Sequence, residues 1–336
     1  MKKYFRLIGI LLFIIIILNI DLEKVWEVLI KANHLILFPV LLMNILVIFF
    51  RSLRWSGVVK IQGFKFPCAK AFWAYLRSLY FGNLTPARVG ELLRIHYLLK
   101  YVKMDSALAT STVIFDKLLD MYLLLIFGLL GFVMSDVWEG QFSFAVKWFF
   151  VLMVIVIPVF VAFPDLMRFL LGFLPNYKNW RDKLLLWIKS FFQGIKSFLV
   201  LRTLISVLIT LCVYLIFFLQ CYWLAYSLNL DINFFYLSFC VVLFSILSVL
   251  PVSISNIGTR ELVLIAMFGF IDIDSESAVS FSLLFFFSIN FFTIILGWLA
   301  FIFYKDENPD NMDELKGLYN QSQMQFTISE QTVKKN

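Results

Sequence analysis

Two short segments place arginine and glutamate beside a glycine in the middle of long apolar runs. The first reads NLTPARVGELLR, from Asn83 to Arg94, and the second reads PVSISNIGTRE, from Pro251 to Glu261. Arginine donates hydrogen bonds to phosphate or carboxylate oxygens, and glutamate can balance that charge or hold a cationic group. A helix that starts at such a break also offers unpaired N–H groups, which suit a phosphate. Both segments therefore have the chemistry of a site for a charged head group.

The candidate residues in these segments carry polar groups or break the helix. Each charge at the centre of a bilayer costs roughly 2.5–3.5 kcal/mol, so we expect the charged side chains to pair and to face a shared polar cavity. The alternative is that the Arg–Glu pairs only hold the two segments in place. The candidates are Asn83, Pro86, Arg88, Gly90, Glu91 and Arg94 in the first segment, and Pro251, Ser253, Asn256, Gly258, Arg260 and Glu261 in the second.

A third polar group lies in the apolar run that follows the first segment. Asp116 and Asp120 are four residues apart, so they share a helix face, and Lys117 is adjacent. These side chains either balance the arginines of the first segment or reach out to the membrane surface and cap the helix. The run before the first segment ends in a pattern typical of an interfacial anchor that also gathers lipid phosphates. Its residues are Arg51, Arg54 and Trp55.

The chain that carries these groups is far more apolar than a soluble domain. Apolar residues make up 62% of its 336 residues, charged residues make up 15%, and the mean hydropathy is +0.89. Several runs of about 18 or more residues carry almost no charge, which is the length that crosses a bilayer as a helix. A β-barrel would instead show alternating segments of about ten residues. The composition therefore predicts an all-α polytopic membrane protein.

Other classes of function lack their sequence signals. The net charge of +7 is typical of a membrane protein with basic cytoplasmic loops, so we do not expect nucleic-acid binding. The four cysteines and two histidines lack metal-ligand spacing, and no metal site is expected. No nucleotide-binding motif is found, so we predict no cofactor and no transport driven by ATP.

The apolar runs predict six full spans and two broken regions. The broken regions, about 71–99 and 234–270, contain the two charged segments, and neither half of either region is long enough to cross alone. Each is expected to form a re-entrant helical hairpin or a discontinuous pair of helices. The six full spans are expected at roughly 5–20, 35–51, 107–134, 144–163, 203–229 and 278–304.

Loop charge predicts the orientation of these spans. The N-terminus and the connections after the second and fourth spans are basic, whereas the segments on the other side lean acidic. By the positive-inside rule, both termini are then cytoplasmic. Residues 181–199 have apolar positions at helical spacing with lysines between them, which fits an interfacial helix or, alternatively, a soluble linker helix. Residues 305–336 are polar and are expected to form a disordered cytoplasmic tail.

The two broken regions also resemble each other. Gly90 and Gly258 are separated by half the length of the chain, and three full spans accompany each break. Because three is odd, the second half would be inverted relative to the first, as in many transporters whose discontinuous helices meet near the bilayer midplane. We therefore expect a membrane domain over 1–304, with repeat halves of about 1–134 and 144–304.

The order of the motifs resembles the lysylphosphatidylglycerol synthase transmembrane family, whose members are also called flippase-like membrane proteins. The strings that carry the resemblance are RSLRW, FGNLTPARVGELLR, STVIFDKLLD and LPVSISNIGTREL, and it runs over roughly residues 5–304. In the best-known member, this membrane unit precedes a soluble domain that transfers lysine from aminoacyl-tRNA to phosphatidylglycerol. The membrane unit is assigned to moving the product lipid between leaflets. Only about 30 polar residues follow the last span here, so aminoacyl transfer is not expected.

One position departs from the family pattern. The third span of the family shows Glu-Arg-x-x-Asp, whereas this chain has Asp116-Lys117-x-x-Asp120. The signs of the charges are kept, but a lysine cannot copy the bidentate contact of an arginine with phosphate. The head-group preference at this point is therefore open.

The resemblance and the charged breaks together predict a lipid translocase of a plasma membrane, with phosphate-bearing membrane lipids as its partners. One alternative is a membrane enzyme that uses polyprenyl phosphate, for which acidic pairs outside the membrane would be the signature. Such pairs exist at Asp21 with Glu23 and at Asp272 with Asp274. Another alternative is an accessory subunit that assists a separate lipid-modifying enzyme without transporting anything.

Overall fold

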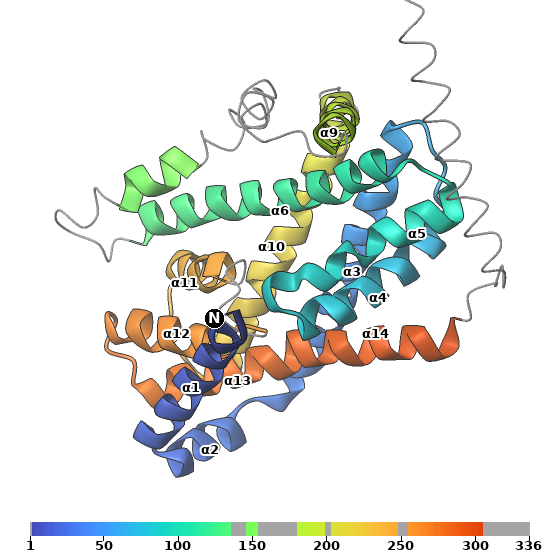
Figure 1. The fold of residues 1–336 in the computed structure, drawn as a ribbon. Coiled ribbons are helices and arrows are strands. Elements are labelled where there is room, and N and C mark those ends of the chain that lie inside the picture. Colours follow the sequence, from blue (N-terminus) through green and yellow to red (C-terminus); the bar gives the residue numbers. More distant parts are fainter. Residues whose placement is uncertain (1, 136–145, 154–179, 199–202, 248–254, 305–336) are drawn as a thin grey trace, which may run out of the picture. The chain divides into compact units, whose positions relative to one another are not determined.

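The computed structural model describes residues 2–135, 146–153, 180–198, 203–247 and 255–304 (Figure 1). Helices account for nearly all of these residues, and no strand occurs among them. The described residues up to Ala300 form one compact unit. The predicted tail at 305–336 lies outside the described residues. The chain is thus an all-α protein, as its composition predicted.

Within the described residues, four helical runs are long and apolar enough to cross a membrane. At 1.5 Å per residue, even the shortest of them measures roughly 37 Å, which exceeds the hydrocarbon thickness of about 30 Å. The fourth run contains a π-helical segment, Phe286–Phe291, between two α-helices. The runs are α3 (Leu37–Ile61), α6 (Ser106–Met134), α10 (Thr203–Ser227), and α13 (Ser275–Phe285) continued by the π segment into α14 (Phe292–Phe303).

Three further helices accompany these spans. The first expected span is the helix α1, Lys2–Asn19, and it leads into the short α2, Leu22–Lys31. The predicted interfacial helix is α9, Trp180–Ser197. The expected span at 144–163 lies largely outside the described residues. Only its residues 146–153 are described, and these are helical. The expected number of six full spans therefore stays a prediction.

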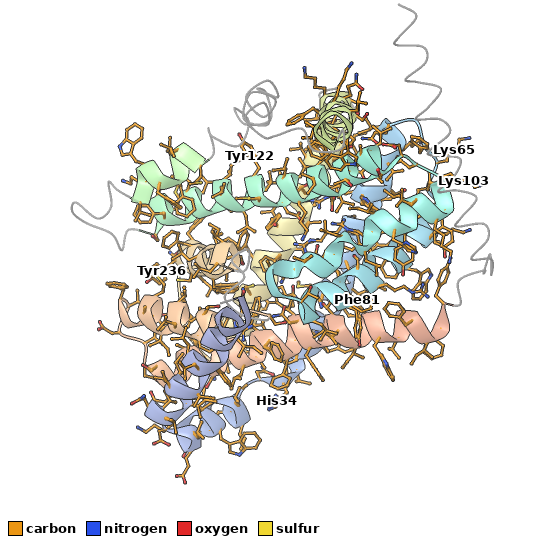
Figure 2. All side chains as sticks on the ribbon, viewed as in Figure 1. His34, Lys65, Phe81, Lys103, Tyr122 and Tyr236 are labelled. Carbon is orange, nitrogen blue, oxygen red and sulfur yellow. The ribbon has the colours of Figure 1, made fainter. Side chains whose placement is uncertain are left out.

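Both broken regions turn back on themselves. In the first, α4 (Cys68–Leu84) is followed by a short 3-10 segment (Pro86–Leu92) and by α5 (Leu93–Val102), which runs back beside α4 (Figure 1). In the second, α11 (Phe234–Leu247) and α12 (Thr259–Gly269) pack together. The Tyr236 hydroxyl on α11 donates to the carbonyl of Met267 on α12 at 2.5 Å (Figure 2). We call these two units the first hairpin, 68–102, and the second hairpin, 234–269.

The two hairpins enter the helical core from opposite ends. Two side-chain contacts show that α3 and α10 are antiparallel: Arg54 Nη1 donates to Thr210 Oγ1 at 2.9 Å, and Gln220 Nε2 donates to the Val40 carbonyl at 2.9 Å. The first hairpin follows the end of α3, and the second follows the end of α10. Because α3 and α10 end on opposite sides, the hairpins start from opposite sides.

A spanning helix from the other half of the chain packs closely against each hairpin. A Cβ added at Gly131 of α6 would lie 2.7 Å from the carbonyl oxygen of Phe235 in the second hairpin. A Cβ added at Gly297 of α14 would lie 2.8 Å from the carbonyl oxygen of Leu76 in the first hairpin. The two glycines lie near the ends of the two predicted repeat halves. An inverted repeat would produce this arrangement, in which the last helix of each half packs against the hairpin of the other half. The repeat itself remains a prediction.

Helix α9 closes one end of α3 and α6. The rings of Phe115 on α6 and Phe198 just beyond α9 stack with their centroids 4.2 Å apart. Val58 of α3 is buried in the same cluster, together with Ile195. Trp187 on α9 remains partly exposed. The helix therefore packs one apolar face against the protein and leaves another face exposed, and its position at the membrane surface stays a prediction.

Candidate functional site

Asp116 joins three helices at the first hairpin. Its two carboxylate oxygens accept separately, from Arg54 Nε of α3 at 2.8 Å and from Arg94 Nη1 of α5 at 2.6 Å. All three side chains have an exposed fraction of 0%. Buried charges are tolerated only when they are paired and hydrogen-bonded, and this carboxylate gives each arginine one short charged contact. Asp116 is therefore a buried bridge between α3, α5 and α6.

Arg54 extends this bridge towards α10. Its Nη1 lies 2.7 Å from Asp120 Oδ1 and 2.9 Å from Thr210 Oγ1. Asp116 and Asp120 thus share one helix face, as their spacing predicted, and they also share Arg54 as a cationic partner, which was not predicted. The expectation of an interfacial anchor is wrong for Arg54 and Trp55, because both are completely buried. Helix α3 continues to Ile61, well beyond the predicted end at residue 51, and carries these side chains inside the protein.

Aromatic rings complete the surroundings of the buried arginines. The guanidinium of Arg94 lies 4.5 Å from the ring centre of Tyr75 and 5.3 Å from that of Trp55. Arg51 lies 5.8 Å from the ring centre of Tyr214, and its Nε is buried without a hydrogen-bond acceptor from the described residues. Aromatic faces attract cations that have lost their water, so these rings help to hold the positive charge. The sequence pattern did not single out Tyr75 or Tyr214.

Glu91 collects three cations at the tip of the first hairpin. Its carboxylate pairs with Lys117 of α6, lies 3.8 Å from Arg94 Nη2, and lies 4.0 Å from Arg88 Nη1. Glu91 itself is almost buried, whereas the side chains of Arg88 and Lys117 are 37% and 36% exposed. The charged cluster therefore runs from the buried Asp116 to an edge where two cations are accessible.

This first charged cluster lies well inside the spanning helices. Arg54 precedes the end of α3 by about two turns, and Asp116 follows the start of α6 by about three turns, which correspond to roughly 10 and 15 Å along each helix. Since α3 ends and α6 begins on the same side as the first hairpin, both positions are at similar depth. The members of the cluster are Arg54, Arg88, Glu91, Arg94, Asp116, Lys117 and Asp120.

The tips of the two hairpins share an unusual backbone conformation. Ala87 and Arg88 have φ angles of 53° and 51°, and Ser255 and Asn256 have φ angles of 51° and 61°. The offset in sequence from the first pair to the second equals the offset from Gly90 to Gly258. Consecutive residues other than glycine in the left-handed region are rare and cost free energy. The sequence similarity of the two breaks is thus matched by their backbone geometry.

Gly90 allows the first hairpin to turn back closely. A Cβ at this position would collide with the backbone of Phe81 on α4, which lies beside the turn (Figure 2). Thr85 fixes the same turn, because its Oγ1 accepts from the Gly90 N–H at 2.8 Å and donates to the Phe81 carbonyl at 2.8 Å. The predicted helix break at this glycine is therefore a close backbone contact. Pro86 begins the 3-10 segment.

The second hairpin has a smaller charged cluster at the start of α12. Arg260 Nη2 lies 2.7 Å from Glu261 Oε1, and Arg260 Nε donates to Ser282 Oγ of α13 at 2.6 Å. The other carboxylate oxygen of Glu261 accepts from the Gly258 N–H at 2.7 Å. The sequence had suggested that the N–H groups at this helix start are open to a phosphate. In the structure, Glu261 instead caps its own helix and occupies the Gly258 N–H. Ser282 was not predicted to belong to the site.

The two tips touch each other. Ser255 Oγ of the second hairpin donates to the carbonyl oxygen of Asn83 in the first at 2.6 Å. Asn256 holds the second tip together, since its side chain donates to the Phe244 carbonyl at 3.1 Å. Among the other candidates, Pro251 and Ser253 lie outside the described residues. The structure therefore brings the two predicted segments together through their tips.

One member of each acidic pair away from the tips serves as a helix cap. Asp21 accepts from the N–H of Glu23 at 3.0 Å, and Asp274 accepts from the N–H of Ser277 at 2.9 Å. Such caps occupy the carboxylates with the first turn of α2 and of α13. No group of three or more potential metal ligands occurs within the parts of the chain that the structure describes.

Comparison with known proteins gives the family. The family model described as "Lysylphosphatidylglycerol synthase TM region" matches residues 6–297. The chain is 26% identical to "UPF0104 membrane protein MJ1595" of Methanocaldococcus jannaschii over 328 residues, covering 93% of this chain and 96% of that relative. It is 28% identical to "UPF0104 membrane protein MJ1078" of the same organism over 232 residues, covering 67% of this chain and 94% of that relative. This multi-pass membrane protein therefore belongs to the family of the lysylphosphatidylglycerol synthase transmembrane region.

Proposed function

We propose that the protein is a lipid translocase of the flippase-like kind. In this proposal the polar head group of a membrane lipid moves past the tips of the two hairpins, while the acyl chains stay in the bilayer. The protein would lie in the plasma membrane with both termini in the cytoplasm. No ATP would be consumed, since the sequence carries no nucleotide-binding motif.

The observation that carries this proposal is the contact between the two tips. Hairpins from opposite sides meet at Asn83 and Ser255, and charged side chains lie around both tips. Discontinuous helices that meet within the membrane are typical of transporters, because the break brings polar groups to a depth that lipid alone would not tolerate. A pair of hairpins that served only as packing elements would not require charge at both tips.

The accessible edge of the first charged cluster supports the same proposal. Charged side chains inside membrane proteins mark substrate pathways more often than they serve stability, since each carries an insertion penalty. Arg88 and Lys117 are more than one third exposed, whereas Arg54, Arg94 and Asp116 are fully buried. We assign the buried residues to positioning and the exposed pair to contact with the lipid.

The alternative of a membrane enzyme has less support. Its expected signature was the acidic pairs, and Asp21 and Asp274 each cap a helix. A role as an accessory subunit predicts the same fold, and only an assay of transport separates it from the translocase.

The test is lipid exchange in proteoliposomes that contain a fluorescent phospholipid. The wild-type protein is expected to expose inner-leaflet label to a quencher added outside, without ATP. The double variant Arg88→Gln with Lys117→Gln should slow this exchange, because both side chains are at the accessible edge. Lys24→Gln with Lys31→Gln is the matched control, since these lysines are exposed and, among the described residues, pair with Asp21 and Glu27 at the start of α2 and within it.

Stable, correctly inserted protein that exchanges no lipid of any head group would refute the translocase. Equal slowing by the control pair would show that the exchange does not use the hairpin tip. Detection of a covalently changed lipid after incubation would favour the enzyme.

A further inference from the structure

The carboxylates of the first charged cluster are all occupied. Asp116 is shared by two arginines, Asp120 pairs with Arg54, and Glu91 is surrounded by three cations. Within the described part of the chain, this cluster offers no carboxylate without a cationic partner. A cationic moiety on a lipid head group would have to displace one of these cations, each of which is held by the protein.

Hydrogen-bond donors, in contrast, are left over. Arg94 is fully buried, and its Nη2 has no hydrogen-bond acceptor among the described residues; the Glu91 carboxylate is 3.8 Å away. Arg88 Nη1 reaches Glu91 only at 4.0 Å, and both Arg88 and Lys117 are partly exposed. Leaving a buried charged donor without an acceptor is costly, so an acceptor that reaches this point would be bound favourably.

The net charge of the first charged cluster is positive, which also favours an anion. The cluster contains four cations, on Arg54, Arg88, Arg94 and Lys117, against three carboxylates. Arg88, Arg94 and Lys117, which we call the cationic trio, converge on the single carboxylate of Glu91. Arg94 also pairs with Asp116, but the cluster as a whole keeps one positive charge in excess, so its edge favours a further anion.

The second hairpin repeats the surplus of donors independently. Arg260 is buried, and its Nη1 has no hydrogen-bond acceptor in the part of the chain that the structure describes. The carboxylate of Glu261 contacts that arginine, Ser282 and the N–H at the start of its own helix. In sequence, Ser282 follows Asp116 by the same number of residues by which Gly297 follows Gly131. The charged cluster of the second hairpin therefore has an uncharged serine at the position that corresponds to the Asp116 carboxylate. Within the described residues, each tip therefore lacks a carboxylate without a cationic partner, and each has an arginine N–H donor without an acceptor.

From this accounting we propose that the site takes the phosphate of a lipid whose head group carries a net negative charge, and that Glu91 is the built-in counter-anion that holds the cationic trio together between turnovers. The phosphate oxygens lie between Arg88, Arg94 and Lys117, next to the Glu91 carboxylate. A cationic or aminoacylated head group is disfavoured, because it adds a positive charge where three already converge. This inference rests on the proposed function for its lipid, but its test measures binding and does not require transport.

Binding is measured on the full-length protein in a neutral detergent, with soluble short-chain lipids as probes. Dioctanoyl phosphatidylglycerol is the anionic probe, dioctanoyl phosphatidylcholine the zwitterionic probe, and dioctanoyl lysylphosphatidylglycerol the cationic probe. Glycerol 3-phosphate presents the phosphate without acyl chains. The expected order of affinity is anionic, then zwitterionic, then cationic. Glycerol 3-phosphate that bound as tightly as phosphatidylglycerol would assign the trio to a soluble anion and overturn the lipid.

Variants at the exposed edge locate the site. Arg88→Gln and Lys117→Gln should each weaken phosphatidylglycerol binding by about tenfold, the loss expected for one charged hydrogen bond, and should weaken phosphatidylcholine binding less, because the choline group already offsets the charge of its phosphate. Lys31→Gln should change neither. If the two edge variants weakened the binding of no lipid, the proposed phosphate contact would be wrong, and if they weakened all lipids equally, the preference for a net negative head group would be wrong.

The variant Glu91→Gln distinguishes two roles of Glu91, as a counter-anion for the cationic trio or as the group that binds a cationic head group. If Glu91 competes with the phosphate, this variant binds phosphatidylglycerol at least as tightly as the wild type. If Glu91 instead holds a cationic moiety, the variant loses the cationic probe. Should Glu91→Gln fail to fold, Arg88→Gln and Lys117→Gln still decide the outcome. Exchange of all head groups at one rate would refute this inference and leave the translocase standing, whereas selective binding without exchange would do the reverse.

Discussion

Replacing Asp116 with asparagine tests whether one buried carboxylate holds α3, α5 and α6 together. The wild-type side chain accepts from Arg54 at 2.8 Å and from Arg94 at 2.6 Å, with no exposed surface. Asparagine has nearly the same shape but only one acceptor oxygen. Its amide nitrogen would face one of the two guanidinium groups, donor against donor. The substitution therefore removes charge and one hydrogen bond without creating a large hole.

The expected magnitude follows from these contacts. A hydrogen bond to a charged group contributes about 1.5–3 kcal/mol, and breaking a buried ion pair on one side costs about 3–5 kcal/mol. The variant also raises the positive excess of the cluster by one charge. We expect a loss of about 3–5 kcal/mol, because the two arginines stay buried with one counter-charge fewer. This corresponds to a fall in the melting temperature of roughly 6–20 °C.

The assay is thermal unfolding of the purified protein in one detergent, compared across variants at one heating rate. Asp120→Asn on the same helix is the matched control, since Asp120 is 17% exposed and pairs with Arg54 at its edge of the cluster. Its loss should be clearly smaller. Arg94→Gln and the double variant Asp116→Asn with Arg94→Gln complete a cycle, in which the double variant should lose less than the sum of the single ones.

Three results would refute this reasoning. A melting temperature of Asp116→Asn within about 2 °C of the wild type would mean that the bridge contributes less than about 1 kcal/mol. Equal losses for Asp116→Asn and Asp120→Asn would show that burial does not decide the cost. Strict additivity in the cycle would show that Asp116 and Arg94 do not act on each other.

Three further predictions concern the hairpins and the π segment. Gly90→Ala should destabilise the protein by about 1–3 kcal/mol, because the added Cβ meets the Phe81 backbone, whereas Gly57→Ala, with open space around it inside α3, should be neutral or stabilising in the same unfolding assay. In a variant whose native cysteines are replaced by alanine, Asn83→Cys with Ser255→Cys should form a disulfide on mild oxidation, seen as a shift on non-reducing gels. Lys65→Cys with Ser255→Cys should not, and crosslinking of both pairs alike would contradict the contact between the tips. Asn44→Leu should cost about 1–2 kcal/mol, because Asn44 donates to Ile289 in the π segment at 3.2 Å and to Thr293 at 3.0 Å, and an equal loss for the exposed Asn19→Leu would argue against this role.

Part of the site could be predicted because it depends on local pattern. The breaks at Gly90 and Gly258 interrupt apolar runs and carry arginine next to glutamate, and charge in such a place must pair. The spacing of Asp116 and Asp120 fixes a common helix face whatever else surrounds the helix. These features need only the period of a helix and the cost of inserting charge, so the sequence contains them.

The partners of the charges could not be predicted in the same way. Arg54 follows Arg51 at the end of an apolar run, which looks like an interface as long as the neighbouring helices are unknown. In the structure, α6 and α10 place Asp116, Asp120 and Thr210 around it, and the helix continues past it. Which helix supplies a counter-charge depends on packing between segments far apart in the chain. The same holds for Lys117 at Glu91 and for Ser282 at Arg260.

By itself, the sequence determined that this is an all-α membrane protein with two charged breaks half a chain length apart, since apolar length and the cost of buried charge act locally along the chain. Only the tertiary structure decided that the breaks meet at Asn83 and Ser255, that Glu261 caps its own helix, and that Glu91 gathers the cationic trio. Those outcomes depend on helices such as α3 and α10 running antiparallel and on glycines such as Gly131 and Gly297 letting helices approach closely. Long-range packing selects one set of partners among many that the same residues would allow.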